Sequence, residues 1–320
     1  MLVSPKILFD HCYGKYAIAA VNVFTMEQVH GLFAAAQASN TPVIVQLTPV
    51  ARNYAHPRML QAMVQAAAQI YPEVIYSIHL DHGTEEHAFS AIDQGYSSVM
   101  IDASHDPFEI NIKRTSAVTK AAHQKNVFVE AELGVLSGVE DDLSVDESMA
   151  KYTNPEQARE FVERSGCDSL AVAVGTSHGA YKFSGGQGLQ FQVLEKIKEQ
   201  LPGYPLVLHG SSSVSSSDVA AINQYGGKLK ENASGVSDSE LQKAIRYGIC
   251  KVNIATDLRL LWTRIHRSFF VEQPELFDPI VPGKKYMEAY REFMIQRFDV
   301  LGCSGQASSI SSKKTSFKTN

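Results

Sequence analysis

Two histidines and an aspartate lie close together in SIHLDHGT, residues 77–84, where an apolar run ends before a glycine. His178 and His209 follow two later apolar runs, and each of them, like His82, is followed by glycine. Three imidazoles that converge from separate elements can hold a catalytic Zn²⁺ and leave one coordination position for a substrate. One such histidine alone more often serves packing, but the three together favour a metal site.

Short apolar runs rich in β-branched residues recur along the chain, and most lack polar alternation, as strands buried on both faces do. There are eight of them, at 17–23, 43–47, 74–80, 98–102, 127–133, 169–175, 205–210 and 250–254. Segments with helical spacing separate them, at 26–38, 58–70, 85–95, 154–166 and 238–248. This alternation predicts an α/β fold, specifically a (β/α)8 TIM barrel. A doubly wound sheet is the alternative, but the first run is not followed by the G-x-G-x-x-G turn expected of it.

The ends of these runs are the next informative feature, because the C-terminal ends of barrel strands form one rim that carries the active site. Nearly all the residues there are polar: Asn22, Gln46, Thr48, His79, Asp81, His82, Asp102, Glu130, Glu132, Thr176, Ser177, His178, His209, Ser211, Ser212, Ser213, Asn253 and Thr256. Glu130 and Glu132 share one face of their strand. A carboxylate that faces the barrel interior needs a metal or a cation as its partner.

Two loops have the composition of a phosphate site. HGSSS at 209–213 offers backbone N–H groups and hydroxyls, and GTSHGAYK at 175–182 adds Lys182. The segment NIAT at 253–256 is placed to close the same pocket. A serine-rich loop alone is weak evidence, but phosphate sites late in the chain are frequent in this fold.

Composition narrows the class of protein. The chain has 320 residues and a net charge of −5, which disfavours a nucleic-acid or anionic-membrane surface, and no apolar run reaches membrane-spanning length. Its scattered cysteines form no C-x-x-C pair, which favours a reducing, cytoplasmic setting. We expect a single barrel domain over 1–303 and a disordered, Ser/Lys/Thr-rich tail over 304–320.

Six motifs occur in order: HLDHG, SVMIDASHDPFEIN, VEAELGVLSGVEDD, GTSHGAYK, LVLHGSSSV and KVNIATDLR. With these motifs the chain resembles the class II, zinc-dependent ketose-bisphosphate aldolases, which act on fructose 1,6-bisphosphate or tagatose 1,6-bisphosphate. The match extends from about residue 5 to GCSGQA at 302–307. The resemblance implies reversible cleavage of fructose 1,6-bisphosphate to dihydroxyacetone phosphate and glyceraldehyde 3-phosphate, in glycolysis or gluconeogenesis.

The resemblance also implies roles for individual residues. Zinc would be held by His82, His178 and His209, and a second metal, or zinc in a buried alternative position, by Asp102 and Glu132. Asp81 would exchange the proton of the C4 hydroxyl, Glu140 would move the proton at the enediolate carbon, and Asn253 would contact the enediolate. One phosphate, helped by Na⁺ or K⁺, would be surrounded by Gly179, Lys182, Gly210, Ser211, Ser212, Ser213 and Thr256.

Three further substrate contacts follow from the same resemblance. Asn22 and Thr48 would face the substrate, and Arg259 would reach the other phosphate, often in the site of a partner subunit. A homodimer or homotetramer is therefore expected. The rival readings are a barrel that keeps a metal only for structure and a regulator that binds sugar bisphosphates without cleaving them.

Zinc chemistry explains why these residue types occur together. As a Lewis acid, zinc stabilises the charge left on the enediolate, while a carboxylate takes the C4 hydroxyl proton. The competing covalent route would use a Schiff-base lysine, for which Lys251 on the last predicted strand is the candidate.

Position 255 departs from the fructose-type pattern, which usually has an acidic residue there. Ala255 is more typical of tagatose-type members. The alternative function is therefore a tagatose-1,6-bisphosphate aldolase or an enzyme of dual specificity, since loss of a hydrogen bond to a charged group is worth about 1.5–3 kcal/mol.

Overall fold

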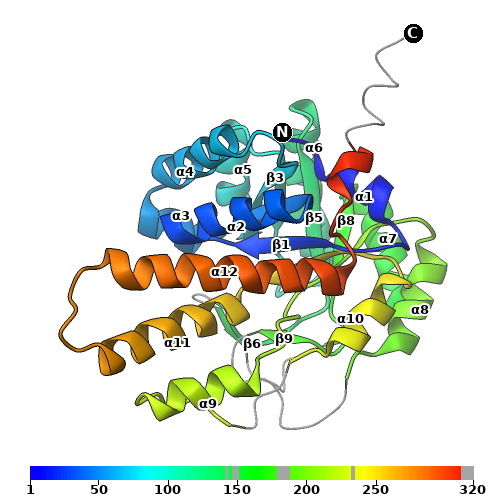
Figure 1. The fold of residues 1–320 in the computed structure, drawn as a ribbon. Coiled ribbons are helices and arrows are strands. Elements are labelled where there is room, and N and C mark those ends of the chain that lie inside the picture. Colours follow the sequence, from blue (N-terminus) through cyan, green and yellow to red (C-terminus); the bar gives the residue numbers. More distant parts are fainter. Residues whose placement is uncertain (141–142, 146–150, 179–187, 232–234, 311–320) are drawn as a thin grey trace.

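The computed structural model describes residues 1–320 except 141–142, 146–150, 179–187, 232–234 and 311–320 (Figure 1). Eight parallel strands close into a barrel in the order β1-β11-β10-β8-β5-β4-β3-β2. They are β1 (Ile18–Asn22), β2 (Val43–Leu47), β3 (Tyr76–Gly83), β4 (Ser98–Ile101), β5 (Phe128–Leu133), β8 (Ser169–Val172), β10 (Leu206–Leu208) and β11 (Ile249–Ile254). The predicted (β/α)8 barrel is confirmed, and each of its strands overlaps one of the eight apolar runs.

Helices cover the outside of the barrel. They are α1 (Pro5–Cys12), α2 (Met26–Ala38), α3 (Pro49–Ala55), α4 (Pro57–Ile70), α5 (Glu85–Asp93), α6 (Phe108–Gln124), α7 (Pro155–Ser165), α8 (Phe191–Gln200), α9 (Ser216–Gln224), α10 (Asp238–Ile245), α11 (Thr256–Glu272) and α12 (Ile280–Leu301). A small separate sheet contains β6 (Ser137–Glu140), β7 (Leu143–Val145) and β9 (Ser177–His178). Local signals fix several helix starts, such as the capping box of Ser237 and Glu240 at α10.

The barrel strands lack polar alternation because helices bury their outer faces while side chains fill the interior. Every residue of β1, β2 and β5 is buried. Helix α12 completes the cover by packing beside α2 and over β1 (Figure 1). The approach is close, since a Cβ built on Gly31 of α2 would lie 2.9 Å from the ring of Tyr290.

The expected disorder of residues 304–320 is wrong for 304–310. Ala307 and Ile310 are buried, and the backbone N–H groups of Gly305 and Ala307 donate to carbonyl oxygens of Ser39 and Asn40 at 2.8 and 3.0 Å. Two apolar side chains among the serines, together with these hydrogen bonds, hold this segment against the end of α2. Residues 311–320 lie outside the described residues.

None of the described helices combines the length and the apolarity needed to cross a membrane.

Candidate active site

Residues 77–83 of the stretch SIHLDHGT lie in β3, which continues to Gly83 instead of ending at residue 80 as predicted, and Thr84 is the N-cap of α5. The register of β3 against β4 shifts between Leu80 and Gly83, and His82 has a φ of 48°. A β-bulge of this kind breaks the alternation of side chains and re-aims one of them. Asp81 and His82, which would otherwise point to opposite faces, therefore both present ligand atoms at the rim.

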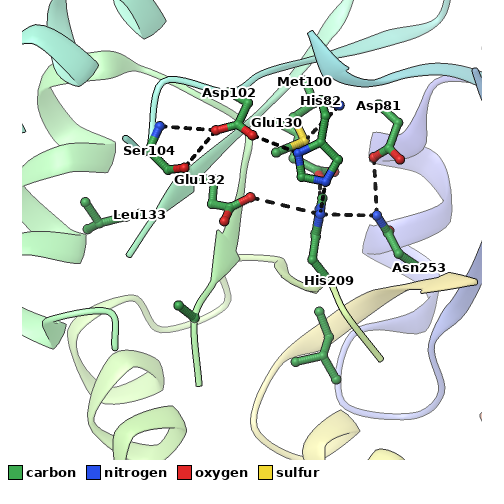
Figure 2. A network of polar contacts seen from close by, with 12 residues as sticks. Asp81, His82, Met100, Asp102, Ser104, Glu130, Glu132, Leu133, His209 and Asn253 are labelled. Carbon is green, nitrogen blue, oxygen red and sulfur yellow. Dashed lines mark hydrogen bonds and ion pairs between the residues drawn. The ribbon is translucent and has the colours of Figure 1, made fainter. Parts of the chain in front are cut away.

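Metal-ligating atoms gather there in two overlapping groups, each with its atoms within 4.8 Å of one another. One group is Asp81, His82 and His209, and the other is His82, Asp102 and Glu132. Figure 2 shows these side chains converging from β3, β5 and the ends of β4 and β10. Imidazole nitrogens and carboxylate oxygens suit Zn²⁺ and related divalent ions. The residues present thus fit a divalent metal.

Asp102 orients His82. Its Oδ2 atom lies 2.8 Å from Nδ1 of His82, and its Oδ1 atom accepts hydrogen bonds from the N–H and the hydroxyl of Ser104 at 3.1 and 2.8 Å. Burial alone would raise the pKa of Asp102, but the hydrogen bonds from His82 and Ser104 outweigh it and hold that pKa well below its usual range. The ionised carboxylate accepts a hydrogen bond from the Nδ1–H group of His82, which turns Nε2 of the ring toward His209 and the metal position.

Two amides hold the carboxylate of Asp81, which is fully buried. Asn22 donates from Nδ2 to Oδ2 at 2.9 Å, and Asn253 donates from Nδ2 to Oδ1 at 3.3 Å. The amide oxygens of Asn22 and Asn253 are buried and have no hydrogen-bond partner among the described residues. An unsatisfied buried acceptor is costly, so these two oxygens are suited to a ligand that carries hydroxyl groups.

Lys251 lies one layer deeper in the barrel and is fully buried. Its Nζ atom is 2.9 and 2.8 Å from the two carboxylate oxygens of Glu130 and 3.3 Å from Nε2 of His79. These contacts account for all three N–H donors of an ammonium group. The arrangement argues against the covalent route, because a Schiff-base lysine must be neutral and must reach the substrate.

The loop after β10 is held in shape by contacts that sequence reasoning missed. Asp257, near the start of α11, accepts hydrogen bonds from the backbone N–H groups of Ser213 and Val214 at 2.9 and 2.8 Å. The hydroxyl of Ser211 donates to the carbonyl oxygen of Asn253 at 2.9 Å. Gly210 has a φ of 58°, and a Cβ there would lie 2.7 Å from a backbone oxygen. Ser211 and Ser213 thus help to build the loop, while the acidic residue that secures it could not be linked to it from sequence.

Four further residues of the predicted site follow strands β2, β10 and β11 in the chain. The hydroxyl of Thr48 accepts a hydrogen bond from the N–H of Ala51 at 3.1 Å and so caps α3. Thr256 is the first residue of α11 and is half-buried. The Arg259 guanidinium lies 5.0 Å from the centre of the Phe24 ring. Ser212 is buried within the loop after β10.

Part of the predicted site lies outside the described residues, namely Gly179, Lys182 and the side chains of His178 and Glu140. Barrel strand β8 ends at Val172, before His178, which lies instead on the short strand β9. There the backbone of His178 pairs with Gly138 of β6, the strand that ends at Glu140. The roles of these four residues stay predictions.

A family model described as class-II fructose-bisphosphate aldolase matches residues 3–306. This chain belongs to that family. The predicted resemblance is confirmed, and as a class-II aldolase the chain is a carbon–carbon lyase. A fructose-bisphosphate aldolase of Giardia intestinalis is 42% identical over 299 residues, which cover 92% of this chain and 90% of that protein. One from Thermus caldophilus is 43% identical over 297 residues, covering 91% and 95%.

Solved structures agree with this assignment. The YdjI aldolase from Escherichia coli K12 matches this class-II aldolase with a TM-score of 0.77 and 30% identity, covering 96% of this chain and all of that one.

Proposed function

We propose that this class-II aldolase cleaves fructose 1,6-bisphosphate reversibly to dihydroxyacetone phosphate and glyceraldehyde 3-phosphate, with zinc as its metal. The observation that carries the proposal is the convergence of Asp81, His82 and His209, whose ligand atoms lie within 4.8 Å of one another at the rim (Figure 2). A carboxylate beside two imidazoles places a proton acceptor next to a metal position. The names of the relatives support the substrate.

His82, His178 and His209 would hold the zinc, and Asp102 and Glu132 would hold a second divalent ion or the zinc in a deeper position. When bound, the metal supplies Lewis-acid stabilisation of negative charge on substrate oxygens.

The protein's own groups then move the protons. Asp81 takes the C4 hydroxyl proton as the C3–C4 bond breaks, while the amides of Asn22 and Asn253 hold its carboxylate in place. The electron pair of that bond passes into the enediolate, which Asn253 contacts. Glu140 returns a proton to the enediolate carbon to give dihydroxyacetone phosphate.

The substrate's phosphates would bind at two places. One would lie within the loops that contain Gly179, Lys182, Gly210, Ser211, Ser212, Ser213 and Thr256, with Na⁺ or K⁺ as an additional cation. Arg259 would contact the other, and Thr48 would face the sugar. The carboxylate of Asp257, which fixes the backbone of the loop after β10, supports a rigid cradle at the first place.

A two-substrate assay tests this function and the choice of sugar together. Ala255 follows β11 directly and occupies the N-cap of α11 without a side-chain cap. In Ala255→Asp, we expect the ratio of kcat/KM for fructose 1,6-bisphosphate over tagatose 1,6-bisphosphate to rise about 10- to 150-fold, because the new carboxylate adds a hydrogen bond of about 1.5–3 kcal/mol to one epimer. An aspartate at an N-cap also stabilises a helix by about 1 kcal/mol.

The unaltered chain provides the reference in the same assay. Release of both triose phosphates from fructose 1,6-bisphosphate supports the proposed function. If the protein bound either sugar bisphosphate without cleaving it, the proposed aldolase function would be wrong, and a regulator that binds sugar bisphosphates would be the better assignment. An unchanged substrate ratio in Ala255→Asp would show that position 255 does not set the preference.

We further propose that the enzyme is a homodimer or homotetramer. The end of the α11–α12 hairpin exposes large apolar side chains, including Phe270 and Phe277, the latter 94% exposed, and such patches mark association surfaces. Sedimentation is expected to show an oligomer that Phe270→Glu combined with Phe277→Glu converts to a monomer. Tyr54→Glu, at an exposed aromatic residue on α3, is the control and leaves the oligomer intact. A monomeric unaltered chain would contradict this proposal.

We also propose that the enzyme is located in the cytoplasm. All four cysteines are buried free thiols, which suits a reducing cytoplasm.

A further inference from the structure

A layer of buried ionisable groups lies inside the barrel beneath the rim, and the proposed chemistry does not use it. Lys251, Glu130 and His79 are at most 2% exposed, and they connect to His209, which is fully buried. Burying an ion pair removes two charges from water at considerable cost. The buried ion pair of Lys251 and Glu130 is therefore expected to serve a specific function.

The protons in this layer can be assigned from the chemistry of its members. Lys251 has only donors, so Nε2 of His79, 3.3 Å away, must accept from it. The other ring nitrogen of His79 then carries a hydrogen and donates it to the hydroxyl of Ser98 at 2.7 Å. Burial and the charge of Lys251 lower the pKa of His79 to about 3, which agrees with a neutral ring. His79 and Glu130 together hold the ammonium group in a fixed position.

The hydrogen-bond partner of His209 fixes the tautomer of its ring. The carboxylate of Glu130, paired with Lys251, can only accept hydrogen bonds, and its Oε1 atom lies 2.9 Å from Nε2 of His209. Nε2 of His209 must therefore carry the hydrogen. In the neutral ring this leaves Nδ1 as a hydrogen-bond acceptor, which lies 2.8 Å from Nε2 of His82 and 3.3 Å from the donor Nδ2 of Asn253 (Figure 2).

We propose that Glu130 and Lys251 are positioning residues that fix the ring orientation and tautomer of His209, so that Nδ1 faces the metal position at the rim. Glu130 does this directly, and Lys251 does it by holding the carboxylate. The inference rests on the proposed function, because it takes His209 as a metal ligand. Groups that orient metal-ligating histidines in this way commonly contribute 10- to 100-fold to metal affinity.

The test uses the full-length protein and two measurements. The first is ¹⁵N NMR of histidine-labelled, metal-free protein, which reports which ring nitrogen of His209 carries the hydrogen and needs no substitution in this layer. The second is zinc affinity, from competition with a chromophoric chelator, in the double variant Glu130→Gln with Lys251→Met. Both residues are replaced because removal of one would leave the other as an uncompensated buried charge, which is strongly destabilising.

The control is Asp238→Asn with Arg297→Met, which removes an ion pair of 2.6 Å between α10 and α12. We expect the hydrogen on Nε2 of His209 in the unaltered protein, a zinc affinity about 10- to 100-fold lower in the Glu130/Lys251 double variant, and an unchanged affinity in the control.

The outcomes separate this inference from the function on which it rests. A hydrogen on Nδ1 in the unaltered protein overturns the inference and leaves the function standing, as does a folded double variant that binds zinc as tightly as the original. If the unaltered protein binds no zinc, both the function and the inference are overturned.

Discussion

Removal of the metal with a chelator is expected to abolish cleavage of fructose 1,6-bisphosphate, and addition of zinc is expected to restore it. Metal stabilisation of a developing anion is worth several kcal/mol, so we expect a fall of at least about 10³-fold in kcat. Lys251, the candidate for a covalent route, offers no substitute, because it is buried with all three N–H donors in use. The measurement is the rate of triose phosphate release before chelation, after it and after add-back.

One control and one follow-up measurement complete this experiment. Circular dichroism of the chelated protein should match that of the loaded protein, since the barrel core is formed by the protein's own side chains. Activity that survives complete metal removal would refute the metal mechanism. Trapping a substrate adduct with borohydride would then show whether Lys251 forms a Schiff base.

The substitution Asp81→Asn is expected to lower kcat by about 10²- to 10⁴-fold, the usual contribution of a positioned proton acceptor. Asparagine has nearly the same shape as aspartate, but its amide group cannot take up the C4 hydroxyl proton at neutral pH. KM is expected to change much less than kcat, because the proposed phosphate contacts remain. Steady-state kinetics on zinc-loaded protein provide both values.

A matched exchange at a remote carboxylate controls for the loss of charge. Asp93, an exposed residue that pairs with Lys125 at 2.6 Å, is expected to tolerate replacement by asparagine with unaltered kinetics. If Asp81→Asn retained a third or more of the original kcat, Asp81 would not be the proton acceptor, and another carboxylate at the rim would have to be considered.

The fold could be predicted from the sequence because its signals are local. Residues 43–47 form an apolar, β-branched run that is a strand with the same bounds, and 26–38 has helical spacing and is a helix with the same bounds. The end of β3 could not be predicted, because the left-handed backbone of His82 depends on its pairing with β4. The order of residues 304–310 could not be predicted either, because Ala307 and Ile310 are buried only through contact with a distant segment.

The candidate site likewise contains residues that the sequence predicts and contacts that it does not predict. Five of its residues can be identified from the sequence, because each stands at the end of an apolar run, where a polar residue is uncommon unless it belongs to a functional site. They are Asp81, His82, Asp102, His209 and Asn253. The contact of Asp257 with the loop after β10 joins segments that no local pattern relates. Lys251 gave a detectable signal, a charge within an otherwise apolar strand, but its partner Glu130 is set by the geometry of the closed barrel.

The closure of the barrel between its first and last strands also bears on how the protein is made. Strand β1 pairs with β11, Ile18 opposite Lys251, so the barrel cannot close until nearly the whole chain has left the ribosome. At about 5–20 residues per second, β1 waits roughly ten to fifty seconds for this neighbour. During that time one edge of an apolar strand is available to other nascent chains. Shielding of that edge during translation is therefore expected to raise the yield of folded enzyme.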